Sequence, residues 1–426
     1  MSFPLRFPRE MEWFLRAGEL LRAIQGDPGR VDLVLALQQL LIRRLARLQL
    51  RHGRLQRARL RLKQRLLRDR LIGEKARATK ELVLKIQDRC DGLEHLRFLY
   101  RCFGDGLAAV YHAPRDHRYF YFEQRTLARD RSGSALGTPL FRRQYRALRL
   151  GIGAGLPVVL TEVTNMLRQG DACVLAGDEP QSLELGSFAQ PGSAGTLRRH
   201  ELLRTMKLLA RKGPWPVQAH PQALEHQAHL NACVQQAMAH EIAQAQAEPG
   251  LRYVVVRSDR YLRDPDCLQG FKGAKSRSTM SIQVAPEMAW VPMQPFTLSM
   301  EAGHAALFMQ GAFQLFVDID VKVLVSHFAS LGVHAMALMD GVTALEIASD
   351  PDDLGHGAYR ISEVIFQRIA CEFISLHGFA QEMAGMLELA QAPGEHDAGD
   401  GDLLFAPPPD GDEVRNYYDD EGPRLH

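Results

Sequence analysis

The sequence has few cysteines, and those present are widely separated. No two of the six form a CxxC pair. Small disulfide-linked scaffolds and zinc ribbons both depend on closely spaced cysteines, so neither class is indicated. We expect single thiols that are buried or half-buried. They are Cys90, Cys102, Cys173, Cys233, Cys267 and Cys371.

Long apolar runs are also missing. No stretch approaches the uncharged apolar length of about 18 residues that a membrane-spanning helix needs. The first residues, "MSFPLRFPREMEWFLRAGEL", contain no signal-peptide core. With 426 residues, 46% of them hydrophobic, the chain can still bury a large core. The sequence therefore predicts a globular, cytoplasmic protein of two or three structural units that makes no membrane contact.

Acidic residues are almost absent from one segment and basic residues from another. Residues 43–80 are overwhelmingly basic and residues 394–422 overwhelmingly acidic, although the formal net charge is only +2. A basic helical surface attracts phosphate backbones through counterion release, so DNA is the expected partner. An acidic protein, or the acidic tail of this chain, is the alternative partner. The arginines between residues 43 and 70 cover nearly every face of the expected helix. Those expected to bind nucleic acid are Arg47, Arg51, Arg54, Arg57, Arg61 and Arg65.

The pattern along the chain predicts an α/β protein in four parts. Residues 1–103 read as a basic helical arm, a hairpin that turns near "LIGEK". Residues 104–248 read as an α/β core, residues 249–390 as an α+β domain, and residues 391–426 as an acidic, disordered tail. The arm carries leucines seven residues apart, a spacing typical of coiled coils and hence of a homo-oligomer. They are Leu41, Leu48, Leu55 and Leu62.

Within the expected core, a short helix in "TPLFRRQYRALRLGIGAG" precedes three extended runs. The runs are "LPVVLTEVTNML", "DACVLA" and "QSLELGSF", and a further helix follows in "TLRRHELLRTMKLLARKG". In the C-terminal part, "FTLSM" and "GAFQLFVDI" read as extended, and residues 319–331 and 358–390 as helical.

Two carboxylates stand in the last two runs of the core, Asp171 and Glu184. If Gly177 and Asp178 form the turn, residue 171 faces residue 184; if the turn moves by one residue, Glu184 lies diagonally from Asp171. In both registers the two side chains share a face of the sheet and could bridge one divalent cation. Such a cation would relieve their repulsion, and Mg²⁺ there could activate water for phosphodiester cleavage.

This order of helix, Asp-bearing strand, Glu-bearing strand and helix resembles the PD-(D/E)xK superfamily of nucleases. The resemblance covers residues 138–212 and implies a restriction-endonuclease-like core, Mg²⁺-dependent DNA cleavage and a role in defence. Asp171 would match the first metal-binding acid and Glu184 the second. Gly186 stands where the family carries its Lys, so a basic residue of the next helix would have to replace it. The candidates are Arg198, Arg199 and Lys207.

Three alternatives remain open at the level of sequence. The core could be a non-catalytic scaffold of a nucleic-acid-binding or assembly protein. The arm could pair with an acidic protein and touch no nucleic acid. Asp171 could be a turn residue and Glu184 a solvent-facing one, which needs no metal. Glu162 and Asn165 could supplement a metal site if their strand lies alongside.

Overall fold

A computed structural model describes most of the chain. The described residues are 5–69, 72–112, 136, 139–167, 170–177, 180–183, 226–268, 278–286, 296–350 and 358–391. They form a mixture of helices and small antiparallel sheets, in agreement with the predicted α/β class.

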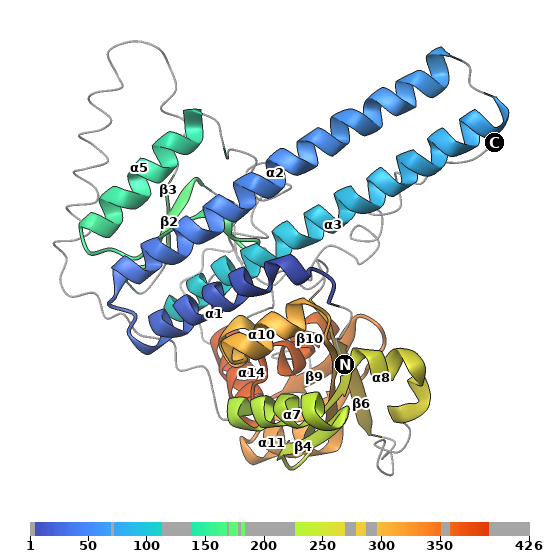
Figure 1. The fold of residues 1–426 in the computed structure, drawn as a ribbon. Helices are drawn as coiled ribbons and strands as arrows, with labels where there is room; N and C mark the ends of the chain where they lie inside the picture. Colours follow the sequence, from blue (N-terminus) through green and yellow to red (C-terminus); the bar gives the residue numbers. More distant parts are fainter. Residues whose placement is uncertain are drawn as a thin grey trace.

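Three N-terminal helices form a bundle from which a hairpin projects (Figure 1). A short 3-10 turn, Pro8–Glu10, leads into α1 (Met11–Gly26), and α2 (Val31–Arg68) and α3 (Gly73–Tyr111) follow. The chain reverses between α2 and α3 at Gly73, whose φ of 61° suits glycine. The side chains of α2 are buried only up to Leu48, and those of α3 only from Ile86 onward. From here on, the arm means residues 49–69 and 72–85, a shorter segment than the predicted arm of residues 1–103. None of these residues is buried.

A small sheet packs against the base of α2. Helix α5 (Pro139–Gly153) precedes β1 (Val158–Leu160), a 3-10 turn (Thr161–Val163), β2 (Ala172–Val174) and β3 (Gln181–Leu183). The strands are antiparallel in the order β1-β2-β3. Gln38 of α2 ties the sheet to the bundle, because its side-chain amide donates to the Val158 carbonyl at 2.7 Å and accepts from the Leu160 N–H at 2.9 Å.

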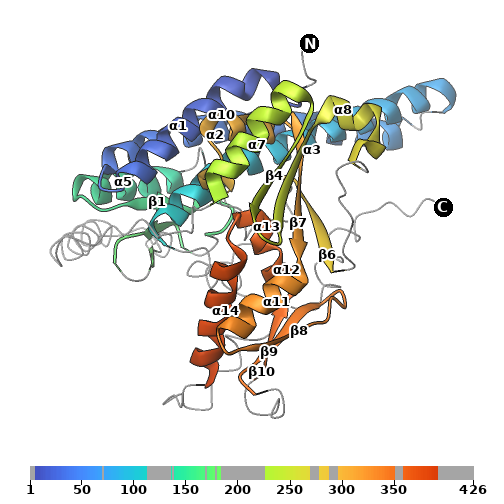
Figure 2. The ribbon, with the colours of Figure 1, turned by 90° about the horizontal axis from the view of Figure 1, so that it is seen from below.

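The C-terminal part contains two antiparallel sheets with helices packed around them (Figure 2). The strand orders are β4-β5-β7-β6 and β10-β9-β8. The strands are β4 (Ile242–Glu248), β5 (Leu251–Arg257), β6 (Thr279–Val284), β7 (Phe313–Asp320), β8 (His334–Ala337), β9 (Thr343–Ala348) and β10 (Ala358–Ser362). The helices are α7 (Gln227–His240), α8 (Ser258–Arg263), α9 (Phe296–Ser299), α10 (Ala302–Met309), α11 (Val321–Ser330), α12 (Glu363–Phe366), α13 (Arg368–Glu372) and α14 (Leu376–Gln391), and a 3-10 turn spans Pro265–Leu268.

One continuous hydrophobic core joins the N-terminal bundle to the C-terminal sheets. Glycines allow the close approach: a Cβ added at Gly18 of α1 would lie 3.0 Å from the Ala302 Cβ of α10. A Cβ added at Gly106 of α3 would lie 2.4 Å from the Thr297 hydroxyl of α9. The helical bundle therefore packs directly on the C-terminal part rather than being joined to it by a linker alone.

Several elements differ from those predicted. Helix α3 continues through residue 103, where the sequence suggested a boundary. The run "QALEHQAHLNACVQQAMAHEIAQAQA", expected to be helical and to belong to the middle part, contains α7 and then strand β4. Strand β4 pairs with β5 in the C-terminal sheet, and α7 packs against both strands. The run "FTLSM" is helical in α9, and residues 358–362 form β10 instead of a helix. Predicted strand β7 and predicted helix α11 are present, and Asp320 caps α11 by accepting the Lys322 N–H.

Candidate nucleic-acid interface and carboxylate site

Eight arginines of α2 recur at intervals of three or four residues. At 3.6 residues per turn, this spacing places all eight within about a third of the helix circumference. The structure leaves every one of them exposed to solvent. We call this row the arginine stripe, and it consists of Arg43, Arg47, Arg51, Arg54, Arg57, Arg61, Arg65 and Arg68.

The stripe carries little local counter-charge. Arg65 pairs with Asp69 at 3.3 Å, and both side chains are about half exposed or more. For the other seven arginines, no carboxylate partner is present among the described residues. Exposed guanidinium groups in a row repel each other unless an anion lies across them. The stripe is therefore suited to a polyanion, and it contains all six arginines predicted to bind nucleic acid.

The sequence suggested that arginines cover nearly every face of the arm, and the structure refines this expectation. Arg44 is not part of the stripe, because it forms a nearly buried ion pair with Glu10. The Glu10 carboxylate also accepts the Tyr100 hydroxyl at 2.7 Å. Burial is the main reason that the pKa of Tyr100 is raised, so its hydroxyl remains a donor. Arg44 is thus a structural cation of the bundle.

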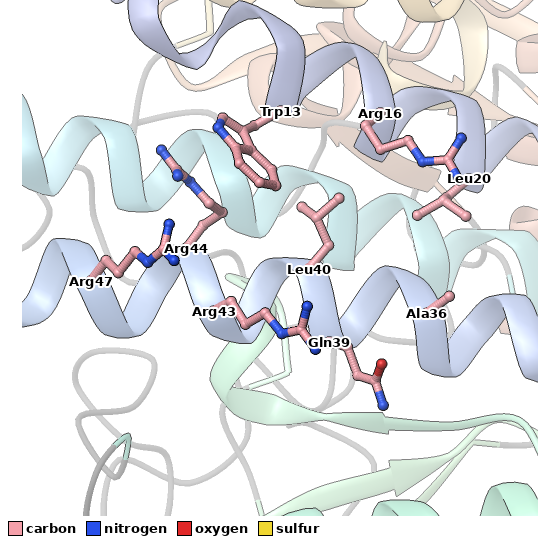
Figure 3. A pocket seen from close by; sticks show the side chains of 9 residues that line it. All are labelled: Trp13, Arg16, Leu20, Ala36, Gln39, Leu40, Arg43, Arg44 and Arg47. Carbon is pink, nitrogen blue, oxygen red and sulfur yellow. The ribbon is translucent and has the colours of Figure 1, made fainter.

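A groove of about 350 Å³ lies between α1 and α2 at the foot of the stripe (Figure 3). Trp13, Arg16 and Leu20 line it from α1. The α2 side carries Ala36, Gln39, Leu40, Arg43, Arg44 and Arg47, so two arginines of the stripe also line the groove. The Arg44 guanidinium packs on the indole of Trp13, 4.6 Å from the ring centroid. Trp13 nevertheless keeps 37% of its surface exposed.

The leucines spaced by seven residues on α2 pack within this chain. Leu41 and Leu48 are buried in the core, and Leu55 packs against it as a partly buried residue. The α2 and α3 helices contact each other extensively along this side. The seven-residue spacing therefore marks an intramolecular helix pair, and homo-oligomerisation through the arm stays a prediction.

Asp171 is held at the start of β2 and is almost completely buried. Its side chain accepts a hydrogen bond from the Gln144 amide of α5 at 2.9 Å, and its backbone N–H donates to the Leu183 carbonyl at 2.7 Å. The described pairs of β2 and β3 run from Val174 with Gln181 to Ala172 with Leu183. This is the register that belongs to a Gly177–Asp178 turn, one of the two considered from the sequence.

The other predicted site residues lie outside the described part of the chain. These are Glu184, Gly186, Arg198, Arg199 and Lys207. The expected helix in "TLRRHELLRTMKLLARKG" and the expected acidic tail also lie outside it. Of the predicted carboxylate pair, the structure therefore places Asp171 alone.

Gln144 is the residue of α5 that faces the carboxylate. It is fully buried, and its Oε1 atom has no hydrogen-bond partner in the part of the chain that the structure describes. A buried oxygen without a donor is costly, and hard cations such as Mg²⁺ prefer oxygen ligands. Asp171 and Gln144 thus offer oxygen atoms of the kind that Mg²⁺ prefers, although Gln144 turns its nitrogen toward Asp171. Among the described residues alone, no group of three His, Cys, Asp or Glu side chains could hold a metal ion.

The turn after β1 is fixed by a residue that the sequence analysis did not single out. Asp105 of α3 accepts hydrogen bonds from the backbone N–H groups of Asn165 and Met166, at 2.7 and 3.0 Å. It also accepts the Asn165 side-chain amide at 2.8 Å. Burial raises the pKa of Asp105 to about 7. Asn165 thus helps to fix the turn, and Glu162 is buried in the same turn.

Comparisons with known proteins give no further guidance. No family model, no curated protein and no solved structure matches this chain. The described helices include none with the length and apolar character to cross a membrane.

Proposed function

We propose that this protein binds nucleic acid along the arginine stripe of α2. The observation that carries the proposal is the row of eight exposed arginines on one helix face, of which Arg65 alone has a carboxylate partner among the described residues. A row from Arg43 to Arg68 extends about 37 Å at 1.5 Å per residue. Contacts of this kind recognise phosphates and do not read base sequence.

The shape of the arm supports the same proposal. The arm extends beyond the body of the protein, so a long polymer could lie along it without meeting the C-terminal sheets (Figure 1). Four more exposed arginines continue the basic surface on α5. They are Arg142, Arg143, Arg146 and Arg149. Helix α5 adjoins the foot of the stripe, where Gln39 donates to the Tyr145 hydroxyl at 3.0 Å.

The test compares three neutralised arginines of the stripe on α2 with three neutralised cations on α3. The variant Arg54→Gln, Arg57→Gln, Arg61→Gln should weaken binding of labelled DNA roughly tenfold or more at low salt. It should also lower the slope of log affinity against log salt by about two to three, because each lost phosphate contact removes about 0.7–0.9. Fluorescence anisotropy over a salt series measures both quantities.

The matched control is Lys80→Gln, Lys85→Gln, Arg89→Gln, which removes the same charge from exposed positions on α3. Glutamine is a good helix former, so both triple variants should keep the helices. The control should retain most of the affinity and the salt slope. Equal losses in the two variants would contradict a localised binding face, and an unchanged stripe variant would exclude the stripe.

A second candidate function is Mg²⁺-dependent cleavage of DNA at the hairpin of β2 and β3. Two observations favour it. The described pairs of β2 and β3 follow one of the two registers from which the sequence predicted a metal site. The Gln144 oxygen has no hydrogen-bond partner among the described residues. Asp171 and Glu184 would hold the ion, and Gln144 would orient Asp171. Bound Mg²⁺ would supply a polarised phosphate and an activated water. The burial of Asp171 requires that the bound substrate, or a movement of the protein, opens the site.

A further inference from the structure

We infer that the groove between α1 and α2 receives an unpaired base of a single-stranded nucleic acid whose backbone lies on the arginine stripe. This inference rests on the proposed function and deepens it, because it specifies which form of nucleic acid is preferred and where its base is held. It rests on the position of Trp13, which is partly exposed and lies at the foot of the arginine stripe.

The lining of the groove matches the two halves of a nucleotide. Trp13, Leu20 and Leu40 supply an aromatic and aliphatic wall for a flat base. Arg43 and Arg47 belong to both the groove and the stripe, so a phosphate beside the base would meet the same cations as the rest of the strand. Among the described residues that line the groove, none carries a carboxylate that would repel that phosphate. Bases of any sequence stack on aromatic side chains, and arginine adds cation–π attraction.

Trp13 is held in place before any ligand binds. The Arg44 guanidinium packs on the indole, and Arg44 is itself fixed by Glu10. Because Glu10 balances the charge of Arg44, this contact orients the ring without adding a further uncompensated cation. A ring that is already ordered loses little side-chain entropy when a base stacks on it.

The straight course of the stripe favours a single strand over a duplex. The stripe is about 37 Å long, which is close to one full turn of B-DNA at about 34–36 Å. Each strand of a duplex winds around the axis over that distance, so a straight row of cations meets its phosphates at a few crossings only. A single strand is flexible enough to follow the row, and its bases are free to enter the groove.

The experiment measures the affinity of Trp13→Ala for three probes of equal length. The probes are single-stranded DNA, an abasic single strand that keeps the phosphates, and duplex DNA. We expect the affinity for the base-containing single strand to fall roughly 5- to 150-fold, the range for loss of one stacked base. Affinity for the abasic strand and for the duplex should stay unchanged. Trp13→Phe, which keeps a ring, should retain most of the affinity of the wild-type protein.

Leu15→Ala is the matched control, since Leu15 is equally exposed on α1 but does not line the groove. Thermal unfolding of each variant verifies that α1 remains packed. An equal loss of affinity for all three probes, or none for any probe, would overturn the stacking site. The Arg54, Arg57, Arg61 variant separates the two proposals: it should weaken binding of all three probes, and if it weakens none, the proposed function fails independently of Trp13.

Discussion

Asp105 shows how a single buried carboxyl group can make stability depend on pH. The side chain lies between α3 and the turn at residues 161–166, where it accepts three hydrogen bonds and is almost without solvent contact. Desolvation disfavours its ionised form more than these hydrogen bonds favour it, so its pKa rises from 3.8 to about 7. The protonated form therefore stabilises the fold at low pH.

The sign of the effect follows from proton binding. Between pH 3.8 and about 7 the folded protein holds the Asp105 proton and the unfolded chain does not, so the free energy of unfolding falls as pH rises through this range. Buried His95 acts in the opposite direction, because burial lowers its pKa from 6.5 to about 4. The two contributions overlap in pH and partly cancel in the wild-type protein.

We predict that Asp105→Asn removes the pH dependence of stability that comes from Asp105 and leaves the one that comes from His95. The difference in free energy of unfolding, variant minus wild type, should rise by about 1–4 kcal/mol as the pH is raised from 4 to 7. Urea unfolding at several pH values measures the difference, and contributions from His95 and other groups cancel in it. A difference that stays constant over this range would contradict a raised pKa for Asp105.

At the scale of elements, the close contact between α3 and the 161–166 turn depends on glycine. A Cβ added at Gly104 would lie 1.9 Å from the Val163 carbonyl oxygen, a backbone atom that cannot rotate away. Helix α3 and the turn must therefore separate if position 104 carries a side chain. The same turn follows β1, which pairs with β2, the strand directly after Asp171.

We predict that Gly104→Ala lowers the free energy of unfolding by roughly 2–3 kcal/mol or more, in spite of the better helix propensity of alanine. Gly92→Ala is the matched control in the same helix, because a Cβ there meets nothing within 4 Å. The control should stabilise the protein by about 0.5–1 kcal/mol. Chemical unfolding of both variants measures the two effects, and equal changes would contradict the close contact.

At the scale of the whole molecule, helix α5 contacts both α2, which carries the arginine stripe, and the strand β2. The exposed face of α5 carries arginines, and its buried face presents Gln144 to Asp171. A strand that leaves the foot of the stripe would meet α5 next. If the second candidate function holds, binding and cleavage use separate residues of one continuous surface.

We therefore predict that Asp171→Asn abolishes Mg²⁺- or Mn²⁺-dependent cleavage of DNA and leaves strand binding within about twofold of wild type. Asparagine keeps the shape of the side chain and an oxygen for the Gln144 amide. Incubation with linear, circular and single-stranded DNA, together with anisotropy, measures both activities. Cleavage that survives in the variant would exclude Asp171. If the wild type cleaves nothing and Gly186→Lys gains no activity, the hairpin is a scaffold and nucleic-acid binding stands alone.

Local patterns predicted some of this architecture, and tertiary contacts decided the rest. The helical hairpin follows from the leucine spacing and the break near Gly73, but spacing alone does not say whether a seam meets its own chain or a second copy. The stripe could have been found by placing the arginines on a helix of 3.6 residues per turn. The run "FTLSM" is too short to distinguish strand from helix by period, and packing against α3 makes it helical.

The candidate sites show the same limit. Asp171 could be singled out because a carboxylate is unusual in an apolar strand, and its partner Gln144 was visible as the one amide of a basic helix. Asp105 gave no such signal, because its hydrogen-bond partners lie 60 residues further along the chain. The Trp13 groove likewise forms only when α1 and α2 pack together. Sequence therefore indicated the chemistry of single elements better than the pairing between them.

Helix α2 runs without interruption from Val31 in the body to Arg68 at the end of the arm. Its buried and projecting halves form one continuous helix, so the arm keeps a fixed direction relative to the body. A phosphate bound at Arg68 would lie about 37 Å along the axis of α2 from a phosphate bound at Arg43. Adding one helical turn to both halves of the hairpin would move the far end outward by about 5.4 Å and leave the groove where it is.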